Sequence, residues 1–487
     1  MLDFLKQENN ITYTENGALT HSTSGNNCLD LFFRAGAMRG ADEKDIADMV
    51  IRAYAENPEK AMKIVFYTRD VRGGLGERRF FRTAIKNLSD YAPEAVKRNI
   101  QYFEEYGRFD DLLVLISTSC ESEAVDEMKK QLDSDIEAMK NNETVSLLAK
   151  WLPSVNATSS ETKAMGKKIA KLFGMKEKNY RHTLSALRKY IDIIENRLRV
   201  SDYTFDYSKQ PSGAMFKYSK AFIRNDNKRY TDYLNAVQKG ETKLNTSTLY
   251  PYEIIRRCNG CMNRDERMSL DVTWNNLPIY CSNDENAIAV IDTSGSMSWS
   301  PNGSVSPLDV ALSLGIYFAE HNKGKFTNHF ITFSKNPKLI EIKGNNIYEK
   351  ILYCNTFSEV ANTDLEAVFN LILTTAVKNK VPQNELPSKI YIISDMEFDM
   401  CIEGGNSMPL FNEMKNKYKN HGYELPDVIF WNVDSRNSNM PIDISDTGAT
   451  LVSGFSPVIF DMAISNELSP ESIMEKVISS ERYAVIK

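Results

Sequence analysis

The chain has 487 residues, two to four times the length of a typical domain, so it should fold into two or three domains with substantial cores. Hydrophobic residues make up 42% and charged residues 25%, which is ordinary for a soluble globular protein and excludes extended disorder. The formal net charge of -6 at pH 7 excludes a uniformly basic, nucleic-acid-coating protein.

The N-terminal residues and the cysteines exclude several locations and scaffolds. Charged residues stand at 3, 6 and 8, where a signal peptide needs an apolar stretch, and nowhere do about 18 apolar residues run together. We therefore expect a cytoplasmic protein without a membrane segment. Seven scattered cysteines do not form a disulfide framework, and Cys258 and Cys261 lack the second pair that a zinc site needs.

The first half of the chain has the periodicity of amphipathic helices. Between residues 42 and 199 apolar residues recur at helical spacing, in two stripes: Ile46, Met49, Val50, Ala53 and Tyr54, then Val125, Met128, Leu132, Ile136 and Met139. Proline and glycine interrupt the pattern at intervals suited to helix pairs, which favours an α-solenoid or an irregular bundle. We predict an all-α, helical-repeat (HEAT-like) domain over 1–260 and, because the pattern weakens beyond 200, a linker over 261–285.

From residue 286 the pattern changes to apolar strands that alternate with helices, which predicts a Rossmann-like α/β domain over 286–487. The predicted strands are 287–291, 328–333, 339–342, 389–394, 427–433 and 450–452. The predicted helices are 307–322, 364–378 and 408–420, followed by a C-terminal helix. Strands that are apolar at every position are those that helices cover on both faces.

Hydroxyl and carboxyl side chains follow the ends of the predicted strands. Asp292, Ser294 and Ser296 come directly after the first strand, Thr363 precedes a helix, and Asp395 ends a later core strand. Ligands bind at the carboxyl ends of parallel strands, so these side chains should converge. An all-oxygen set predicts Mg²⁺ or Mn²⁺ rather than zinc. The alternative is that the serines cap a helix and the carboxylates are ordinary strand ends.

This combination of residues resembles the metal-ion-dependent adhesion site of von Willebrand factor A domains. The resemblance covers about 200 residues and implies that Ser294, Ser296 and Thr363 ligate the ion directly. Asp292 and Asp395 would then hold its water ligands. It also implies that the ion takes an acidic group, such as a partner's Asp or Glu, as its last ligand.

The helical half carries a second resemblance, to an uncharacterised family that joins such a helical region to a von Willebrand A domain. Five segments carry it: 16–18 (NGA), 21–25 (HSTSG), 67–79 (YTRDVRGGLGERR), 107–113 (GRFDDLL) and 150–154 (KWLPS). The architecture is similar to that of the Ro autoantigen, or TROVE-type, ribonucleoproteins. That likeness implies a ring of helices that binds RNA, and it is an analogy of architecture.

Basic residues in the middle of the chain give separate support for RNA. Residues 1–150 carry 20 Lys and Arg against 26 Asp and Glu, residues 151–280 carry 23 against 13, and residues 281–487 carry 16 against 26, which gives net charges of -6, +10 and -10. A basic middle favours a polyanion or the acidic part of the same chain. The candidate RNA-binding residues are Arg72, Arg78, Arg79, Lys163, Lys167, Lys171, Arg181, Arg188 and Lys189.

Each of these candidates has a structural alternative. For the lysines, the alternative is a solvated helix face. We consider four aromatic residues for base stacking, and the alternative for them is a place in the core: Tyr180, Tyr190, Tyr218 and Phe222. The glycine-rich segment 72–79 could wrap a phosphate, or it could simply be a tight turn between helices. It lacks the Gly-Lys-Ser/Thr ending of a nucleotide-binding loop.

The sequence thus favours a non-enzymatic, Ro-like RNA-binding scaffold with a Mg²⁺-holding A domain. The alternative is a metal-dependent protein-protein adaptor with no role for nucleic acid. A hydrolytic activity is the weakest hypothesis, because a single cation without a general base is a poor catalyst. The five histidines pair with no obvious nucleophile, and no catalytic motif is present.

Overall fold

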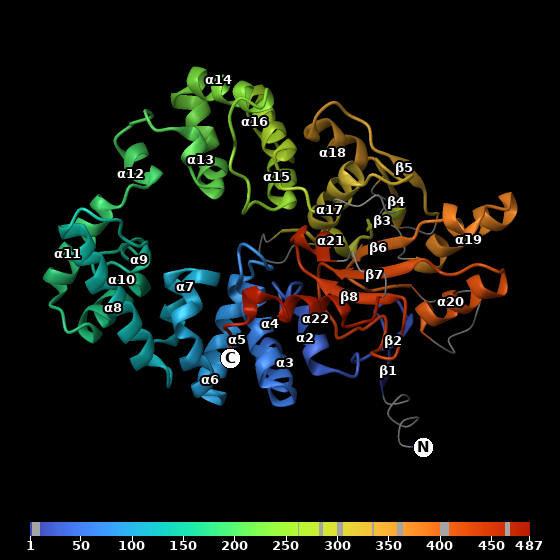
Figure 1. Ribbon diagram of the computed structural model, residues 1–487, viewed down its shortest axis with the longest axis horizontal. Coiled ribbons are helices and arrows are strands. Elements are labelled where there is room, and N and C mark those ends of the chain that lie inside the picture. The colour runs from blue at the N-terminus through green and yellow to red at the C-terminus, as the bar shows by residue number, and fades with distance from the viewer. Residues whose placement is uncertain are drawn as a thin grey trace.

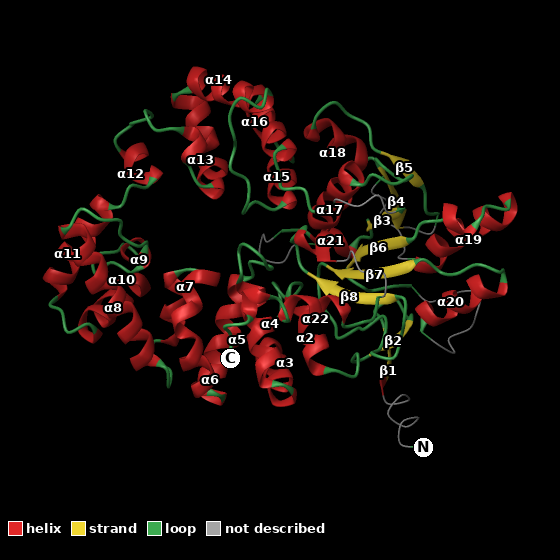
Figure 2. Cartoon of the chain, viewed as in Figure 1, coloured by secondary structure: helices red, strands yellow, loops and turns green. Residues whose placement is uncertain are grey.

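The elements of the chain follow one another around a closed circuit. The computed structural model describes residues 1, 10–261, 263–281, 286–299, 305–333, 336–357, 364–399, 409–462 and 468–487. Figure 1 shows the helices leaving the sheet at α2, passing through α8–α11 and α13–α14, and returning to the sheet at α15–α17. The strands are confined to one side of the molecule (Figure 2), so a helical region and an α/β region are distinct.

The helical region begins with a short hairpin and continues as packed helices. Its strands are β1 (Ile11–Tyr13) and β2 (Leu19–His21), and its first helices are α2 (Asn27–Ala35), α3 (Glu43–Glu56), α4 (Pro58–Arg69), α5 (Arg78–Tyr91), α6 (Pro93–Asn99), α7 (Phe103–Tyr106), α8 (Glu121–Lys140), α9 (Leu148–Trp151), α10 (Ser160–Leu172) and α11 (Glu177–Tyr190). The predicted stripe on α3 is buried at Ile46, Met49, Val50 and Ala53. None of the helices in the described ranges is both long and apolar enough to cross a membrane.

The stretch in which the helical pattern weakens is also helical. It contains α12 (Ile194–Arg199), α13 (Ser212–Asn225), α14 (Asn227–Gln238), α15 (Pro251–Cys258) and α16 (Arg264–Asn275). Helix α16 lies inside the span 261–285 that we expected to be a linker. A separate core holds this group together, and it is rich in aromatic residues: Ile194, Phe205, Tyr207, Met215, Phe222, Tyr230, Leu234, Val237 and Val272. Aromatic residues, two of them tyrosines, occupy several of the buried positions here, and the sequence shows only a weak apolar periodicity.

The α/β region is built on a six-stranded sheet in the order β5-β4-β3-β6-β7-β8. Its elements are β3 (Ala287–Asp292), α17 (Pro307–His321), β4 (His329–Phe333), β5 (Leu339–Glu341), α18 (Ile347–Asn355), α19 (Leu365–Asn379), β6 (Lys389–Ser394), α20 (Leu410–Asn420), β7 (Asp427–Asn432), β8 (Ala449–Ser453), α21 (Val458–Met462) and α22 (Ser472–Ile478). Only β5 is antiparallel to its neighbour. Every residue of β3, β6 and β8 is buried, as the apolar runs predicted.

The order of the strands creates a switch point between β3 and β6. From β3 the chain goes to β4 on one side and later returns to β6 on the other side. Connections that leave in opposite directions open a crevice at the carboxyl ends of the two strands. Ile291 pairs with Ile393 in the register, so Asp292 and Ser394 end their strands at the same level. The candidate metal residues therefore stand at the place where an α/β sheet binds ligands.

The N-terminal end of the helical region docks on the edge strand β8. The hydroxyl of Ser453 donates a hydrogen bond to the carbonyl of Phe32 at 3.0 Å and accepts one from the amide of Gly36 at 3.1 Å. A Cβ at Gly36 would lie 2.7 Å from the Cα of Gly454, so the two backbones touch and only glycine fits. This contact covers the exposed edge of the sheet with helix α2.

The C-terminal segment docks on the same helices from the other direction. The carboxylate of Asp70, which is fully buried, pairs with the guanidinium of Arg482 and accepts a hydrogen bond from the hydroxyl of Tyr483 at 3.0 Å. The ring of Tyr483 stacks on Tyr106, with centroids 5.7 Å apart. Asn99 exchanges hydrogen bonds with the backbone of Lys487.

The far end of the helical region contacts the α/β region through α15 and α16. The indole N–H of Trp274 donates to Glu320 of α17 at 2.7 Å, and Asp271 accepts from the amide of Ile347 at 2.8 Å. Asn259 donates to Asp309 at 3.0 Å. The helical region is thus attached to the α/β region at both of its ends, which closes the circuit.

We predict that replacing Arg482 with Met will lower the free energy of unfolding by about 3 kcal/mol, because it leaves the buried carboxylate of Asp70 without its cation. Lys60→Met is the matched control. It removes a pair with Glu475, whose side chains are both 36% exposed, between the same two parts of the chain, and should cost less than about 1 kcal/mol. Urea denaturation measures both values; equal effects of the two substitutions would contradict the prediction.

Candidate functional site

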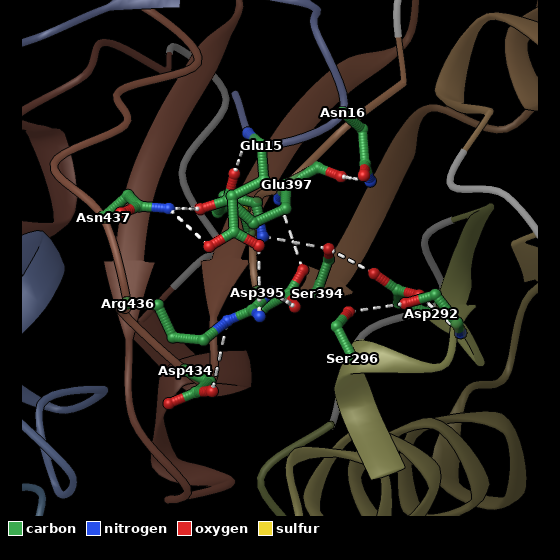
Figure 3. Close-up of polar contacts among 12 residues, drawn as sticks. Glu15, Asn16, Asp292, Ser296, Ser394, Asp395, Glu397, Asp434, Arg436 and Asn437 are labelled. Atoms are coloured by element: carbon green, nitrogen blue, oxygen red, sulfur yellow. Dashed lines mark hydrogen bonds and ion pairs between the residues drawn. The ribbon is translucent and has the colours of Figure 1, made fainter. Parts of the chain in front are cut away.

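The loop after β3 holds two serine hydroxyls beside a buried carboxylate. Asp292 has no exposed surface. One of its oxygens accepts from the amide of Ser294 at 2.9 Å, and the other accepts from the hydroxyl of Ser394 at 2.5 Å. The hydroxyl oxygens of Ser294 and Ser296 lie 3.0 Å apart. Strand β3 and its neighbour β6 together fix the carboxylate, which in turn shapes the serine loop (Figure 3).

Asp395 follows β6 and faces the same crevice (Figure 3). One oxygen accepts from the amide of Glu397 at 3.2 Å, and the other accepts from the guanidinium of Arg436 at 2.6 Å. Between them Met396 has a φ of 66°, a left-handed conformation that is uncommon for a side chain other than glycine. The tight turn holds the carboxylate of Asp395 toward the loop of Asp292.

The electrostatics of this crevice favour a cation. Burial, followed by the negative charge of Asp395, raises the pKa of Asp292 above its ordinary value. The same two causes raise the pKa of Asp434 to about 6. The buried hydroxyl of Thr293 has no hydrogen-bond partner in the described part of the chain. A cation would stabilise the charged forms of these carboxylates, which burial and mutual repulsion otherwise disfavour.

The described residues fit a hard divalent cation. Two neighbouring ligands of an octahedral ion with bonds of 2.0 to 2.1 Å lie about 2.9 Å apart, close to the 3.0 Å between the hydroxyls of Ser294 and Ser296. Thr363, the third predicted direct ligand, lies outside the described residues. Three or more His, Cys, Asp or Glu side chains nowhere gather as metal ligands within the described ranges, so a cation here would depend on hydroxyl oxygens and two carboxylates.

The N-terminal hairpin borders this crevice, which the sequence did not reveal. Arg436, which pairs with Asp395, also lies 3.2 Å from the carboxylate of Glu15. The backbone amide of Glu15 donates to Glu397 at 2.7 Å, and Asn437 donates to both carboxylates at 2.9 Å. Glu15 lies 382 residues from Glu397 and 422 from Asn437, and no spacing rule connects them.

Three of the predicted RNA-binding residues meet at one pocket formed by α11, by α12 (Ile194–Arg199) and by residues 154–156, which follow α9. Arg181, Arg188 and Lys189 line a cavity of about 640 Å³. Its other lining residues are Ser154, Val155, Asn156, Tyr180, His182, Leu184, Ser185, Asn196 and Arg199. Arg181, Lys189 and Arg199 are exposed. The guanidinium of Arg188 instead donates to the carbonyls of Ala149 and Leu152 and to the hydroxyl of Ser154, so it orders the end of α9.

The other predicted basic residues do not line this pocket. Lys163, Lys167 and Lys171 are exposed on α10, where Lys167 lies 3.4 Å from Glu177. Arg72, which follows α4, donates to the backbone carbonyl of Glu105, and Arg79, in the first turn of α5, donates to that of Arg39.

Arg78 stands close to other arginines. Partial burial and the charges of Arg108 and Arg82 lower the pKa of Arg78. Because its neighbours are cations, Arg78 would gain from an anion at this surface.

Some of the residues considered for other roles belong to the core. Tyr180 and Phe222 are fully buried, so the structural alternative holds for these two rings. The hydroxyl of Tyr180 donates to the carbonyl of Pro153 at 2.9 Å. Tyr190 donates to the carbonyl of Glu143 at 2.9 Å. Cys258 and Cys261 are buried free thiols, and burial raises the pKa of both.

Comparisons with known proteins match the two regions to separate models. A domain of unknown function, DUF7788, matches residues 286–483. Uncharacterized protein L728 of Acanthamoeba polyphaga mimivirus is 28% identical over 510 residues, which cover 96% of this chain and 87% of that protein. The crystal structure of Deinococcus radiodurans RO (RSR) protein aligns with a TM-score of 0.44 at 11% identity, over 93% of this chain and 99% of that one.

The helical region matches a second domain of unknown function, DUF2828. The match covers residues 14–134 and 124–278, which together are more than half of the chain. Matching residues thus extend from the N-terminal hairpin through α16, including the stretch in which the helical pattern is weak. The chain therefore belongs to the uncharacterised family defined by DUF2828.

Proposed function

We propose that this protein is a non-enzymatic RNA-binding scaffold of Ro-like architecture with a metal-holding A domain. The observation that carries the RNA part is the basic pocket of about 640 Å³ formed by α11, α12 and residues 154–156. Exposed Arg181, Lys189 and Arg199 surround it, and they lie in the segment of the chain that has a net charge of +10. Clustered cations of this kind bind a phosphate backbone without regard to sequence.

The polar lining of the pocket supports a flexible, single-stranded ligand. Polar groups from Ser154, Asn156, Ser185 and Asn196 stand among the cations, so bases and sugars would meet hydrogen-bonding partners. Unpaired nucleotides can place both their phosphates and their base edges in such a pocket, whereas a duplex presents mainly its phosphates and 2′-hydroxyls. Because the helical region is attached at both ends, it should lose little conformational freedom when it binds a ligand.

The second part of the proposal concerns the α/β region as a von Willebrand A-type domain. Its strand order, and the convergence of Asp292, Ser294, Ser296 and Asp395 at the switch point, support a site for Mg²⁺ or Mn²⁺. Ser294 and Ser296, with Thr363, would hold the ion, and Asp292 and Asp395 would orient its waters. When bound, the ion supplies an electrophilic position for a carboxylate or phosphate oxygen. Ser296 is only half-buried, which leaves this side of the site partly open to that group.

A metal-dependent protein adaptor is the second candidate. The net charge of -10 over residues 281–487 disfavours a nucleic acid at the α/β region, while the candidate site would accept a partner's Asp or Glu. Pull-downs after nuclease treatment, with and without EDTA, separate the two functions. A partner that survives nuclease and is lost with EDTA would favour the adaptor over the RNA scaffold.

For RNA, we predict that the double substitution Arg181→Gln with Lys189→Gln will weaken binding of a single-stranded RNA oligonucleotide by roughly tenfold at 0.1 M salt. The slope of log affinity against log salt should also become shallower by about 1.4, because two phosphate contacts are lost and each contributes about 0.7 for a single strand. Filter binding across a salt series measures both quantities. The control is Lys130→Gln with Lys140→Gln, which removes the same charge from exposed positions on α8.

Two results would count against the RNA part of the proposal. The first is that the wild-type protein binds no RNA even at low salt. The second is that the control pair loses as much affinity as the pocket pair, which would show that total charge and not the pocket governs binding.

For the metal, we predict that Ser294→Ala will weaken Mn²⁺ binding by at least about tenfold, since it removes a direct oxygen ligand. Ser298→Ala is the control, because this exposed serine lies two residues beyond Ser296 in the same loop. Isothermal titration calorimetry of both variants measures the affinities. Unchanged binding in Ser294→Ala would exclude the proposed ligand set.

A further inference from the structure

Arg436 places a positive charge at the edge of the candidate metal site. Its guanidinium lies 2.6 Å from Asp395, 3.2 Å from Glu15 and 3.8 Å from Asp434 (Figure 3). The side chain of Asp395 is 1% exposed, whereas that of Arg436 is 27% exposed. The buried carboxylate is therefore neutralised by a cation that belongs to the chain and that retains access to solvent.

Both oxygens of Asp395 already have a donor. One accepts from the amide of Glu397 and the other accepts from Arg436. In the metal-site proposal, Asp395 must also accept hydrogen bonds from the waters of the ion, with the lone pairs that these two donors leave. A divalent cation in the crevice would also repel the guanidinium, because two like charges would share one buried carboxylate.

We propose that Arg436 is a tethered cation that competes with the divalent ion for Asp395, and that ion binding thereby loosens the N-terminal hairpin from the sheet edge. This inference rests on the metal site proposed above. It assigns Arg436 a role as a positioning residue that sets the affinity of the site, and it links that affinity to a segment of the chain about 380 residues away.

The contacts of Glu15 carry the link to the hairpin. Its carboxylate pairs with Arg436 and accepts from Asn437, and its backbone amide donates to Glu397. Glu397 lies two residues beyond Asp395 and donates its own amide to that carboxylate. A shift of Arg436 away from Asp395 therefore disturbs both the charge that holds Glu15 and the turn that holds Glu397.

Thermodynamic linkage makes the effect reciprocal. If the ion weakens the contact between Arg436 and Asp395, then the same contact weakens ion binding by an equal factor. The hairpin keeps other attachments that do not involve Arg436, such as the hydrogen bonds of Thr14 to Phe398 and of Thr20 to Met440. The ion should therefore loosen the turn around Glu15 without releasing the whole hairpin.

Calorimetric titration of the full chain with Mn²⁺ tests the competition. Arg436→Gln should bind Mn²⁺ roughly fivefold or more tightly than the wild type, the range expected for an energetic coupling between two sites. Arg34→Gln is the matched control, because Arg34 donates to the hydroxyl of neighbouring Ser435 at 3.0 Å and makes no contact with Asp395. Its affinity should equal that of the wild type. Equal or weaker binding by Arg436→Gln would overturn the inference.

Hydrogen exchange tests the link to the hairpin. Saturating Mn²⁺ should increase amide exchange at residues 14–18 in the wild type and leave it unchanged in Arg436→Gln. Glu15→Gln should weaken protection there even without Mn²⁺, because it removes the charge that pairs with Arg436. If Mn²⁺ leaves amide exchange at residues 14–18 of the wild type unchanged, the link is overturned.

These measurements separate failure of this inference from failure of the metal proposal. If Mn²⁺ binds and Ser294→Ala abolishes binding, but Arg436→Gln has no effect, only the competition is wrong. If neither the wild type nor Arg436→Gln binds Mn²⁺, both proposals are wrong. Binding by Arg436→Gln alone would support both, because the tethered cation would then be the only obstacle to the ion.

Discussion

The buried carboxylate of Asp70 is the contact on which the architecture depends most directly. It accepts from the backbone amide of Arg72 in the turn after α4, and it pairs with Arg482 and Tyr483 from the other end of the chain. Burial and the charge of Asp70 raise the pKa of Tyr483, so its hydroxyl remains a proton donor. A buried charge must be satisfied by several partners at once, and here those partners can meet only when the helical region and the α/β region are correctly assembled.

A second consequence of this assembly is that the candidate metal site is not formed by the α/β region alone. The sheet supplies Asp292 and Asp395, and the switch point between β3 and β6 brings them together. The N-terminal hairpin supplies Glu15, and the helix α2 that follows it packs on the edge strand β8 where Gly36 meets Gly454. The packing of two glycine backbones and the charge balance of the crevice are therefore connected through the same short stretch of chain.

The sequence predicted those features that depend on neighbouring residues and missed those that depend on assembly. Continuous apolar runs identified the strands of the sheet to within one or two residues, and Asp292 and Ser294 could be placed at a strand end for the same reason. Helix α18 was not among the predicted helices, although its buried residues Ile347, Ile351 and Cys354 stand at helical spacing, and α16 lay in the predicted linker. Arg188 was predicted to bind RNA from its charge; it lines the pocket and also ties α11 to the end of α9, a structural contact that charge alone does not predict. No pattern in the neighbouring sequence indicated that Glu15 or Arg436 would lie at the site.

The helical region and the α/β region carry local charges of opposite sign, which suits them to different ligands. The basic pocket lies by α11 and α12, and the sheet with its acidic crevice lies on the opposite side of the circuit (Figure 1). Because surface charges separated by more than about 8 Å are screened at physiological salt, the crevice does not neutralise the pocket directly. Each region can therefore keep a strong local potential of its own sign, although the whole chain has a net charge of only -6. A ligand that engages both regions must be extended, with a phosphate backbone at one end and an oxygen donor for a metal ion at the other.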